Sequence, residues 1–179
     1  MLLGTHTAGH LEKLLEELER QSGPPSPEAL ERVSEAIAGM FRLKPDEVAV
    51  LEILPSGRLL RFVIPQKLHA AGTIPVNSNT ALVARTARLR RAEIVNNFPS
   101  FRHATVFEAF PLGRRSEEAI QKILSAPIVR DNRVIGVLQI CRKGISALDA
   151  GPDFTASDLA EVKGLGDLLA RFLACGRAS

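Results

Sequence analysis

The sequence contains no tryptophan and no tyrosine, and its charges are nearly balanced. Its 23 lysines and arginines stand against 20 aspartates and glutamates, which gives a net charge of +3. A dedicated nucleic-acid-binding protein usually has a concentrated basic surplus, and it often stacks bases on aromatic rings. This chain lacks the surplus and offers only eight phenylalanines for stacking, so we expect no nucleic-acid partner.

Cysteine and long apolar segments are also scarce. The two cysteines, Cys141 inside an apolar run and Cys175 near the C-terminus, do not indicate a disulfide framework. No segment approaches the roughly 18 uninterrupted apolar residues that suggest a membrane span. Residues 1–6 lack the basic and apolar regions of an export signal. These absences predict a cytoplasmic protein that has no membrane partner.

The residues that are present suffice for one hydrophobic core, since 45% of the 179 are hydrophobic. Leucines at positions 11, 14, 15 and 18 predict an amphipathic helix near the N-terminus. A segment rich in proline and glycine then interrupts the chain. We expect residues 1–21 to be a dimerisation or connecting helix, 22–26 a linker, 27–173 the main domain and 174–179 a tail.

Hydrophobic periodicity predicts the elements of the main domain. The first half of the domain is expected to contain a helix capped by Ser26, a hairpin over 48–54 and 59–64, and a helix over 80–91 capped by Asn77 to Thr80. The second half is expected to contain a short helix from Ser116 that buries Ile120, Ile123 and Leu124, a hairpin over 126–129 and 134–142, and a final helix capped by Thr155. Both faces of the segment 134–142 are apolar, which indicates helices on both sides of the sheet. The predicted class is α+β, with an antiparallel sheet flanked by helices.

The second hairpin and the residues after it carry the most specific pattern. It comprises Ser125 to Val129, Val134 to Ile140, Lys143, Phe154-Thr155 and Asp158-Leu159, and a looser pattern precedes it in Ile74-Pro75-Val76, Leu82-Val83 and Ala92 to Asn96. Over residues 27–173 the chain resembles a GAF domain. The resemblance implies an antiparallel sheet of about six strands, dimerisation through the terminal helices, and a small-molecule pocket between the sheet and the irregular middle segment.

Functional motifs of the family match only in part. Members that bind cyclic nucleotides share Lys143, Phe154 and Asp158, but Arg142 and Leu159 depart from their pattern, which argues against that ligand. Neither cysteine is followed by histidine, as in members that attach a bilin, and residues 65–116 lack the cysteines of members that reduce methionine sulfoxide. The sequence therefore points to no particular ligand or cofactor.

Candidate ligand-binding residues follow from the expected pocket. A helix start with free N–H groups suits an anion, arginines supply positive charge, and the Phe-rich segment supplies apolar walls. The candidates are Asn79, Thr80, Arg85, His103, Phe110 and Gln139. These candidates also have purely structural alternatives, since the arginines can form a solvated helix face and His103 can be a solvated loop residue. A metal site at His6 and His10 is not expected, because no third metal ligand lies nearby in the sequence.

We weigh three functions. The first is a non-enzymatic sensory or regulatory GAF domain that binds a small molecule and signals through dimer geometry or contacts with a signalling protein. The second is a small redox enzyme of the methionine-sulfoxide-reductase type, which requires a reactive cysteine and conflicts with the buried pattern around Cys141. The third is a ligand-free structural dimerisation module. The first is our sequence-based prediction.

Overall fold

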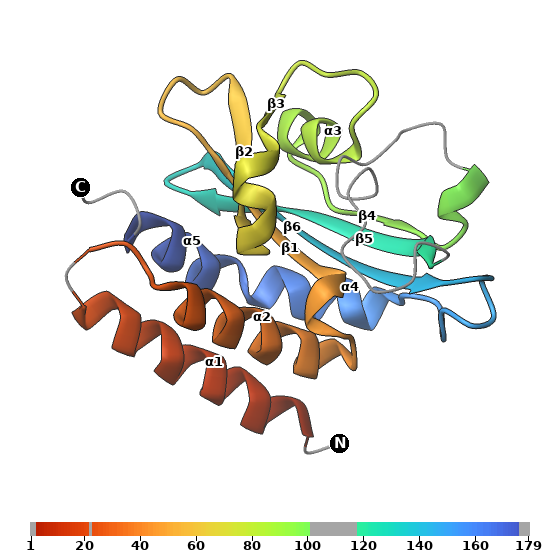
Figure 1. Cartoon of the computed structure of the whole chain (residues 1–179), viewed down its shortest axis with the longest axis horizontal. Coiled ribbons are helices and arrows are strands. Elements are labelled where there is room, and N and C mark those ends of the chain that lie inside the picture. The colour runs from red at the N-terminus through yellow and green to blue at the C-terminus, as the bar shows by residue number, and fades with distance from the viewer. Residues whose placement is uncertain (1–2, 22, 101–117, 176–179) are drawn as a thin grey trace.

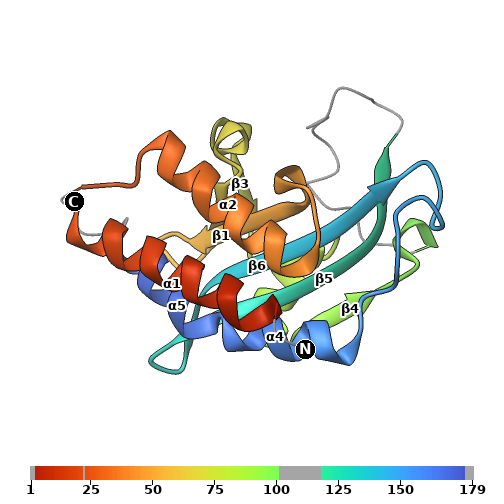
Figure 2. The ribbon, with the colours of Figure 1, turned by 90° about the horizontal axis from the view of Figure 1, so that it is seen from below.

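A six-stranded antiparallel sheet with helices on both faces forms the framework of the chain (Figures 1 and 2). The computed structural model describes residues 3–21, 23–100 and 118–175. The strands are β1 (Val48–Ile53), β2 (Leu59–Ile64), β3 (Thr73–Pro75), β4 (Glu93–Val95), β5 (Ala119–Arg130) and β6 (Arg133–Gly144). The helices are α1 (Leu3–Arg20), α2 (Pro27–Phe41), α3 (Leu82–Leu89), α4 (Ala156–Gly164) and α5 (Gly166–Cys175), with short 3₁₀ turns η1 (Pro45–Glu47), η2 (Gln66–Ala71) and η3 (Phe98–Ser100).

The strand order is β3-β2-β1-β6-β5-β4, which confirms the predicted α+β class and both predicted hairpins. The hairpin of β5 and β6 is longer than predicted, since its register runs from Ala119 opposite Gly144 to Arg130 opposite Arg133. Its turn residues Asp131 and Asn132 have φ angles of 49° and 58°. Aspartate and asparagine tolerate this left-handed conformation, which explains why the turn was recognisable.

One face of the sheet is covered by α1, α2 and α5, which lie together below it in Figure 1. Helix α2 begins as predicted, because Ser26 Oγ accepts a hydrogen bond of 3.2 Å from the Ala29 N–H and Pro27 occupies the first turn. Its apolar side, including Val33 and Ile37 at 0% exposure, packs into the core of this layer. The predicted N-terminal cap and apolar stripe are therefore confirmed.

The N-terminal helix α1 packs on α2 and α5 of its own chain (Figure 2). The four leucines of its stripe are buried there: Leu11, Leu14, Leu15 and Leu18 have exposed fractions of 0–5%. The sequence predicted a dimerisation or connecting helix over residues 1–21. The stripe is instead covered within one chain, so the leucines do not by themselves require a second copy.

The other face of the sheet is covered by α3, which lies above the sheet in Figure 1. Leu68 of η2 and Phe98 of η3 belong to the same apolar cluster. A second apolar cluster fills this layer, with Leu51, Phe62 and Val137 from the strands meeting Leu82 from α3. Helices thus lie on both faces, as the apolar pattern of residues 134–142 predicted. The sheet separates two distinct layers.

The short helix predicted from Ser116 is wrong where the structure describes it. Ile120, Ile123 and Leu124 belong to β5, and Ser116 lies outside the described residues. Adjacent Ile123 and Leu124 point to opposite faces and are buried in different apolar clusters. Such two-sided burial is typical of a central strand and mimics a helix when only apolar spacing is counted.

The final helix is also corrected, since it consists of two helices that meet at Leu165. Thr155 caps the first of them as predicted: its Oγ1 accepts from the Asp158 N–H at 3.3 Å, and Asp158 accepts in return from the Thr155 N–H at 2.6 Å. Gly164 and Gly166 flank the break. Glycine lowers helix stability, so the helix is interrupted here. The helical spacing of the apolar residues nevertheless continues across the break, which is why the sequence predicted one helix.

The middle helix is shorter than the predicted span of 80–91. It ends at Leu89 because Arg90 adopts a left-handed φ of 52°. At the other end Ala81 occupies the N-cap position without a side-chain hydrogen bond, so the predicted cap by Asn77 to Thr80 is wrong. Ser78 Oγ instead accepts from the Thr80 N–H at 3.3 Å and forms a local turn before the helix. Ser and Asn clusters favour such turns as readily as caps, which explains the error.

Candidate ligand-binding site

A row of polar residues crosses the sheet beneath α3. Glu93 of β4 pairs with Ser125 of β5, and Ser125 pairs with Gln139 of β6. Residues directly opposite one another in a sheet share a face, so the three side chains lie side by side on the face that α3 covers. From α3, Thr86 and Arg85 reach down to this row. We call Glu93, Ser125 and Gln139, with Thr86 and Arg85, the polar row.

Three members of the polar row form a directed hydrogen-bond chain. Gln139 Nε2 donates to Ser125 Oγ at 3.1 Å, the Ser125 and Thr86 hydroxyls are 2.7 Å apart, and Thr86 Oγ1 donates to the Leu82 carbonyl at 3.0 Å. Because Thr86 uses its only proton on Leu82, Ser125 must donate to Thr86. The chain therefore runs from β6 through β5 to the first turn of α3.

These three side chains are 0–1% exposed inside an otherwise apolar layer. A buried hydroxyl or amide without a partner costs about 1–3 kcal/mol, whereas a satisfied network specifies one arrangement of the groups it joins. The chain thus fixes α3 relative to the sheet. The sequence analysis selected Gln139 but missed Thr86 and Ser125, since isolated Ser and Thr residues in apolar segments carry no distinctive spacing.

At the β4 side of the sheet, the polar row ends in an ion pair between Arg85 and Glu93. Arg85 Nη2 lies 3.0 Å from Glu93 Oε1, and the two side chains are 28% and 15% exposed. Arg91 Nη2 is 3.9 Å from the same oxygen. The second carboxylate oxygen, Glu93 Oε2, is buried and has no hydrogen-bond partner among the described residues. A buried acceptor of this kind calls for a donor that the described residues do not supply.

The other candidate residues lie in different surroundings. Asn79 and Thr80 are exposed, in the turn before α3. His103 and Phe110 lie outside the described residues. The structure thus joins Arg85 and Gln139 to one polar row, and it places Asn79 and Thr80 at the start of the helix that covers this row.

The remaining arginines of the basic segment make intramolecular contacts. Arg88 Nη1 donates to the Val76 and Ser78 carbonyls at 2.8 and 2.6 Å, and so fastens the turn before α3. Arg90 Nη2 donates to the backbone and side-chain oxygens of Asn132 at 2.5 and 2.8 Å. Arg88 thus ties α3 to the turn that precedes it, and Arg90 ties the end of α3 to the β5–β6 turn. Charge alone did not reveal these structural roles.

The residues of the partial cyclic-nucleotide motif also have structural roles. Arg142 stacks over the Phe154 ring at 4.9 Å and donates to the Phe41 carbonyl at 3.3 Å. Lys143 Nζ lies 3.3 Å from an Asp46 carboxylate oxygen, while Asp158 caps α4. Arg142 thereby joins β6 to α2 and to the segment before α4, and Lys143 joins β6 to η1.

The described residues show where Cys141 lies and how possible metal ligands are grouped. Cys141 is 0% exposed within the apolar cluster under α3. No group of three or more His, Cys, Asp or Glu residues in residues 3–21, 23–100 and 118–175 is arranged to hold a metal ion. Within the same residues, no helix is long and apolar enough to cross a membrane.

Comparison with known proteins assigns the family. The sequence matches a GAF domain family model over residues 27–174. No curated protein matches the chain significantly. Among solved structures, a GAF domain from an Acinetobacter phosphoenolpyruvate-protein phosphotransferase superposes with a TM-score of 0.70 at 14% identity, covering 99% of this chain and 96% of that one.

Two further solved structures illustrate the range of proteins that share this fold. A GAF domain from a Coxiella burnetii phosphoenolpyruvate-protein phosphotransferase gives a TM-score of 0.66 at 15% identity, covering 98% of this chain and 96% of that one. A free methionine-R-sulfoxide reductase from Neisseria meningitidis gives 0.61 at 14% identity, covering 97% and 92%. Likenesses at this level of identity show the fold alone. The family match spans both layers and every strand, and the chain belongs to the GAF domain family.

Proposed function

We propose that this chain is a sensory or regulatory GAF domain that binds a small molecule at the polar row, between the sheet and α3. Family membership supports the class of function, because GAF domains are commonly small-molecule-binding sensory modules. The observation that carries the site is Glu93 Oε2, a buried acceptor without a donor beside the accessible Arg85 guanidinium. A ligand N–H or O–H group bound to this oxygen would complete the hydrogen bonding of the row.

The candidate residues acquire distinct roles in this proposal. Arg85 and Glu93 bind the polar group of the ligand at the accessible edge, and Gln139 belongs to the buried floor. Asn79 and Thr80 lie at the rim, near the start of α3, and His103 and Phe110 are proposed to complete the wall. The ligand is then a small molecule that donates a hydrogen bond to Glu93 and carries an anionic or accepting group for Arg85.

Signalling is proposed to pass through dimer geometry or contacts with a signalling protein, in the cytoplasm. The hydrogen-bond chain supports a route, because it joins the floor of the site to the first turn of α3. A ligand that binds Arg85 in place of Glu93 would break the ion pair between α3 and β4, and so weaken one of the contacts that hold α3 on the sheet. The domain is proposed to act without catalysis of its own.

The redox alternative makes a different prediction about Cys141. A nucleophilic thiol must be accessible and ionisable, and Cys141 is 0% exposed among apolar residues. In a Cys175→Ser background, we expect Cys141 of the folded protein to react with iodoacetamide only as fast as the protein unfolds. Rapid alkylation under native conditions would favour the enzyme over the sensor.

A thermal-shift screen with polar metabolites tests the proposal. The variant Glu93→Gln replaces the unpaired oxygen by an amide that donates, so a hit that raises the melting temperature of the parent protein should lose its effect. Glu35→Gln, on the exposed side of α2, is the matched control and should respond like the parent. Hits that stabilise all three proteins equally would contradict binding at the polar row. So would a screen in which no metabolite stabilises the parent.

A further inference from the structure

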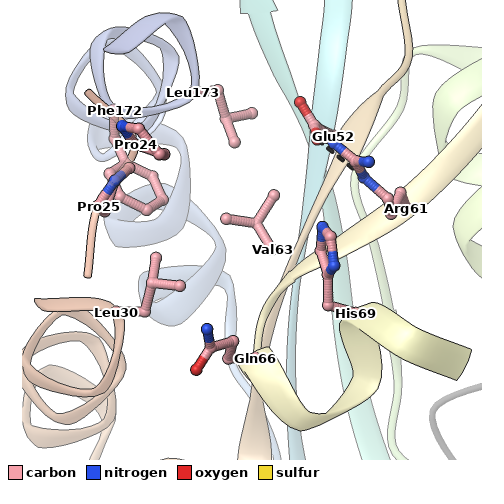
Figure 3. A pocket seen from close by; sticks show the side chains of 10 residues that line it. All are labelled: Pro24, Pro25, Leu30, Glu52, Arg61, Val63, Gln66, His69, Phe172 and Leu173. Atoms are coloured by element: carbon pink, nitrogen blue, oxygen red, sulfur yellow. Dashed lines mark hydrogen bonds and ion pairs between the residues drawn. The ribbon is translucent and has the colours of Figure 1, made fainter. Parts of the chain in front are cut away.

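A cavity lies on the opposite face of the sheet from the polar row. It has a volume of about 300 Å³ and lies between the N-terminal end of α2, the C-terminal end of α5 and the strands β1 and β2 (Figure 3). This volume is at the lower end of the range for small-molecule sites. We call it the helix-face cleft. The ten lining residues are Pro24, Pro25, Leu30, Glu52, Arg61, Val63, Gln66, His69, Phe172 and Leu173.

The two sides of the helix-face cleft differ in chemistry, as Figure 3 shows. One side consists of apolar groups from the linker, α2 and α5, among them Pro25, Leu30 and Phe172. The other side carries Glu52, Arg61 and His69 from β1, β2 and η2. An apolar wall opposite a few polar groups is the usual arrangement of a site that orients an amphipathic molecule.

An ion pair forms the polar side of the cleft. Arg61 Nε and Nη2 both donate to Glu52 Oε1, at 3.2 and 2.6 Å, and the two residues are directly opposite in the β1–β2 register. The Glu52 side chain is only 12% exposed, whereas Arg61 is 38% exposed. The remaining guanidinium nitrogen, Nη1, has no hydrogen-bond partner within the described part of the chain, so its two N–H groups are available to an acceptor.

The charges of Glu52 and Arg61 determine whether a charged or an uncharged acceptor binds better at Arg61 Nη1. Glu52 and Arg61 together are neutral, and a second carboxylate at Arg61 would lie close to the buried Glu52 charge. An uncharged carbonyl oxygen accepts from Arg61 Nη1 without that repulsion. Gln66 and His69 line the same side and provide further hydrogen-bonding groups. We propose that the helix-face cleft binds a small amphipathic molecule with an apolar chain and an uncharged head that accepts hydrogen bonds.

The cleft also borders the contact between Leu173 of α5 and Gly136 of β6. Gly136 of β6 is paired with Glu52, and a Cβ at Gly136 would lie 2.5 Å from Leu173 Cδ1, which lines the cleft. Leu173 therefore rests directly on the glycine surface of the sheet. A molecule in the cleft would contact α5 at this point and favour its docked position. The site is separate from the polar row, since the sheet lies between them.

Octanamide is the probe that tests this proposal, with octanoate as its charged counterpart. In ¹H–¹⁵N NMR titrations at neutral pH, octanamide should shift the amide signals of Val63, Gln66 and Leu173 and leave those of Thr86 and Glu93 unchanged. Octanoate should bind more weakly because of Glu52. Shifts at the polar row instead, equal or tighter binding of octanoate, or no saturable shift would each overturn the proposal.

Two variants separate a specific site from general apolar adhesion. Val63→Phe fills the cleft without disturbing the ion pair and should abolish the shifts. Arg61→Lys keeps a cation beside Glu52 but removes the planar guanidinium, and should weaken binding about tenfold, as expected for one hydrogen bond to a charged group. Arg58→Lys, in the exposed β1–β2 turn, is the matched control and should bind like the parent. Unchanged binding in Val63→Phe would overturn the assignment even if Arg61→Lys fails to fold.

Discussion

At the scale of single residues, Gly136 shows how closely the helical layer approaches the sheet. A Cβ at this position would overlap the Leu51 carbonyl oxygen of β1 and the Leu173 side chain of α5. The carbonyl belongs to the ladder between β1 and β6, so it cannot move aside without breaking strand pairing. The absence of a side chain is therefore required here by packing and not by a turn.

Substitution of Gly136 by alanine should lower the free energy of unfolding by about 1–3 kcal/mol, the usual cost of overpacking a core. Gly164→Ala is the control, because a Cβ there meets nothing within 4 Å and removes a flexible residue from α4. It should leave stability unchanged or raise it. Urea unfolding followed by circular dichroism measures both, and equal stabilities of the two variants would contradict the close approach.

The hydrogen-bond chain of the polar row makes a second prediction at this scale. Ser125→Ala removes the acceptor of Gln139 Nε2, so a buried amide loses its partner at a cost of about 1–3 kcal/mol. In the double variant Ser125→Ala/Gln139→Met that amide is gone, and part of the stability should return. A double-mutant cycle from urea unfolding measures the coupling. Strictly additive effects would mean that the two side chains do not depend on each other.

At the scale of elements, the contact between α1 and α5 joins the two ends of the described chain. Arg171 Nε and Nη2 donate to the two carboxylate oxygens of Glu19, both at 2.7 Å. These hydrogen bonds, more than the charge of Arg171, hold the pKa of Glu19 below its usual value against a smaller opposing effect of burial. A carboxyl with a lowered folded-state pKa stabilises the fold while it is ionised.

This pKa shift gives α1 docking a pH dependence. The contribution of Glu19 is fully present above its unfolded-state pKa and is lost as the pH falls through the lowered folded-state value. The melting temperature of the parent should therefore exceed that of Glu19→Gln at pH 7, and the difference should shrink toward pH 3. Glu35→Gln, on the exposed side of α2, is the matched control. A difference between parent and Glu19→Gln that is constant across this pH range would contradict the contact.

The elements also show which sequence signals were sufficient. Side-chain chemistry predicted the caps and turns at Ser26, Asp131 and Thr155 correctly, but it failed at the expected cap of α3 by Asn77 to Thr80. Predictions from apolar spacing alone were wrong at two places. At β5, burial on both faces produced a spacing like that of a helix, and at Leu165 one regular apolar spacing continues across two separate helices. These errors arise because periodicity records which residues are buried and not which backbone buries them.

The candidate site was predictable only in part for a related reason. Arg85 and Gln139 were selected from charge and from position on the expected pocket face. Glu93, Ser125 and Thr86 become visible only through the register of β4, β5 and β6 and the placement of α3 above them. Strand register depends on pairings between residues far apart in sequence, which no local pattern records.

At the scale of the whole molecule, the sheet divides the domain into a face covered by α3 and a face covered by α1, α2 and α5 (Figure 1). The polar row lies on the first face and the helix-face cleft on the second. The terminal helices α1 and α5 pack together on the second face, so their docking is physically separate from the proposed ligand site. Within the described residues, the polar row is built from the sheet and α3.

Native mass spectrometry of freshly purified protein tests whether a small molecule is bound at the polar row. Such binding predicts a species heavier than the polypeptide by the mass of one small molecule, which is released on denaturation and identified by its fragments. The same species should be absent from Glu93→Gln and present in Glu35→Gln. A parent protein that shows only the polypeptide mass, or a bound molecule retained by Glu93→Gln, would contradict ligand binding at the polar row.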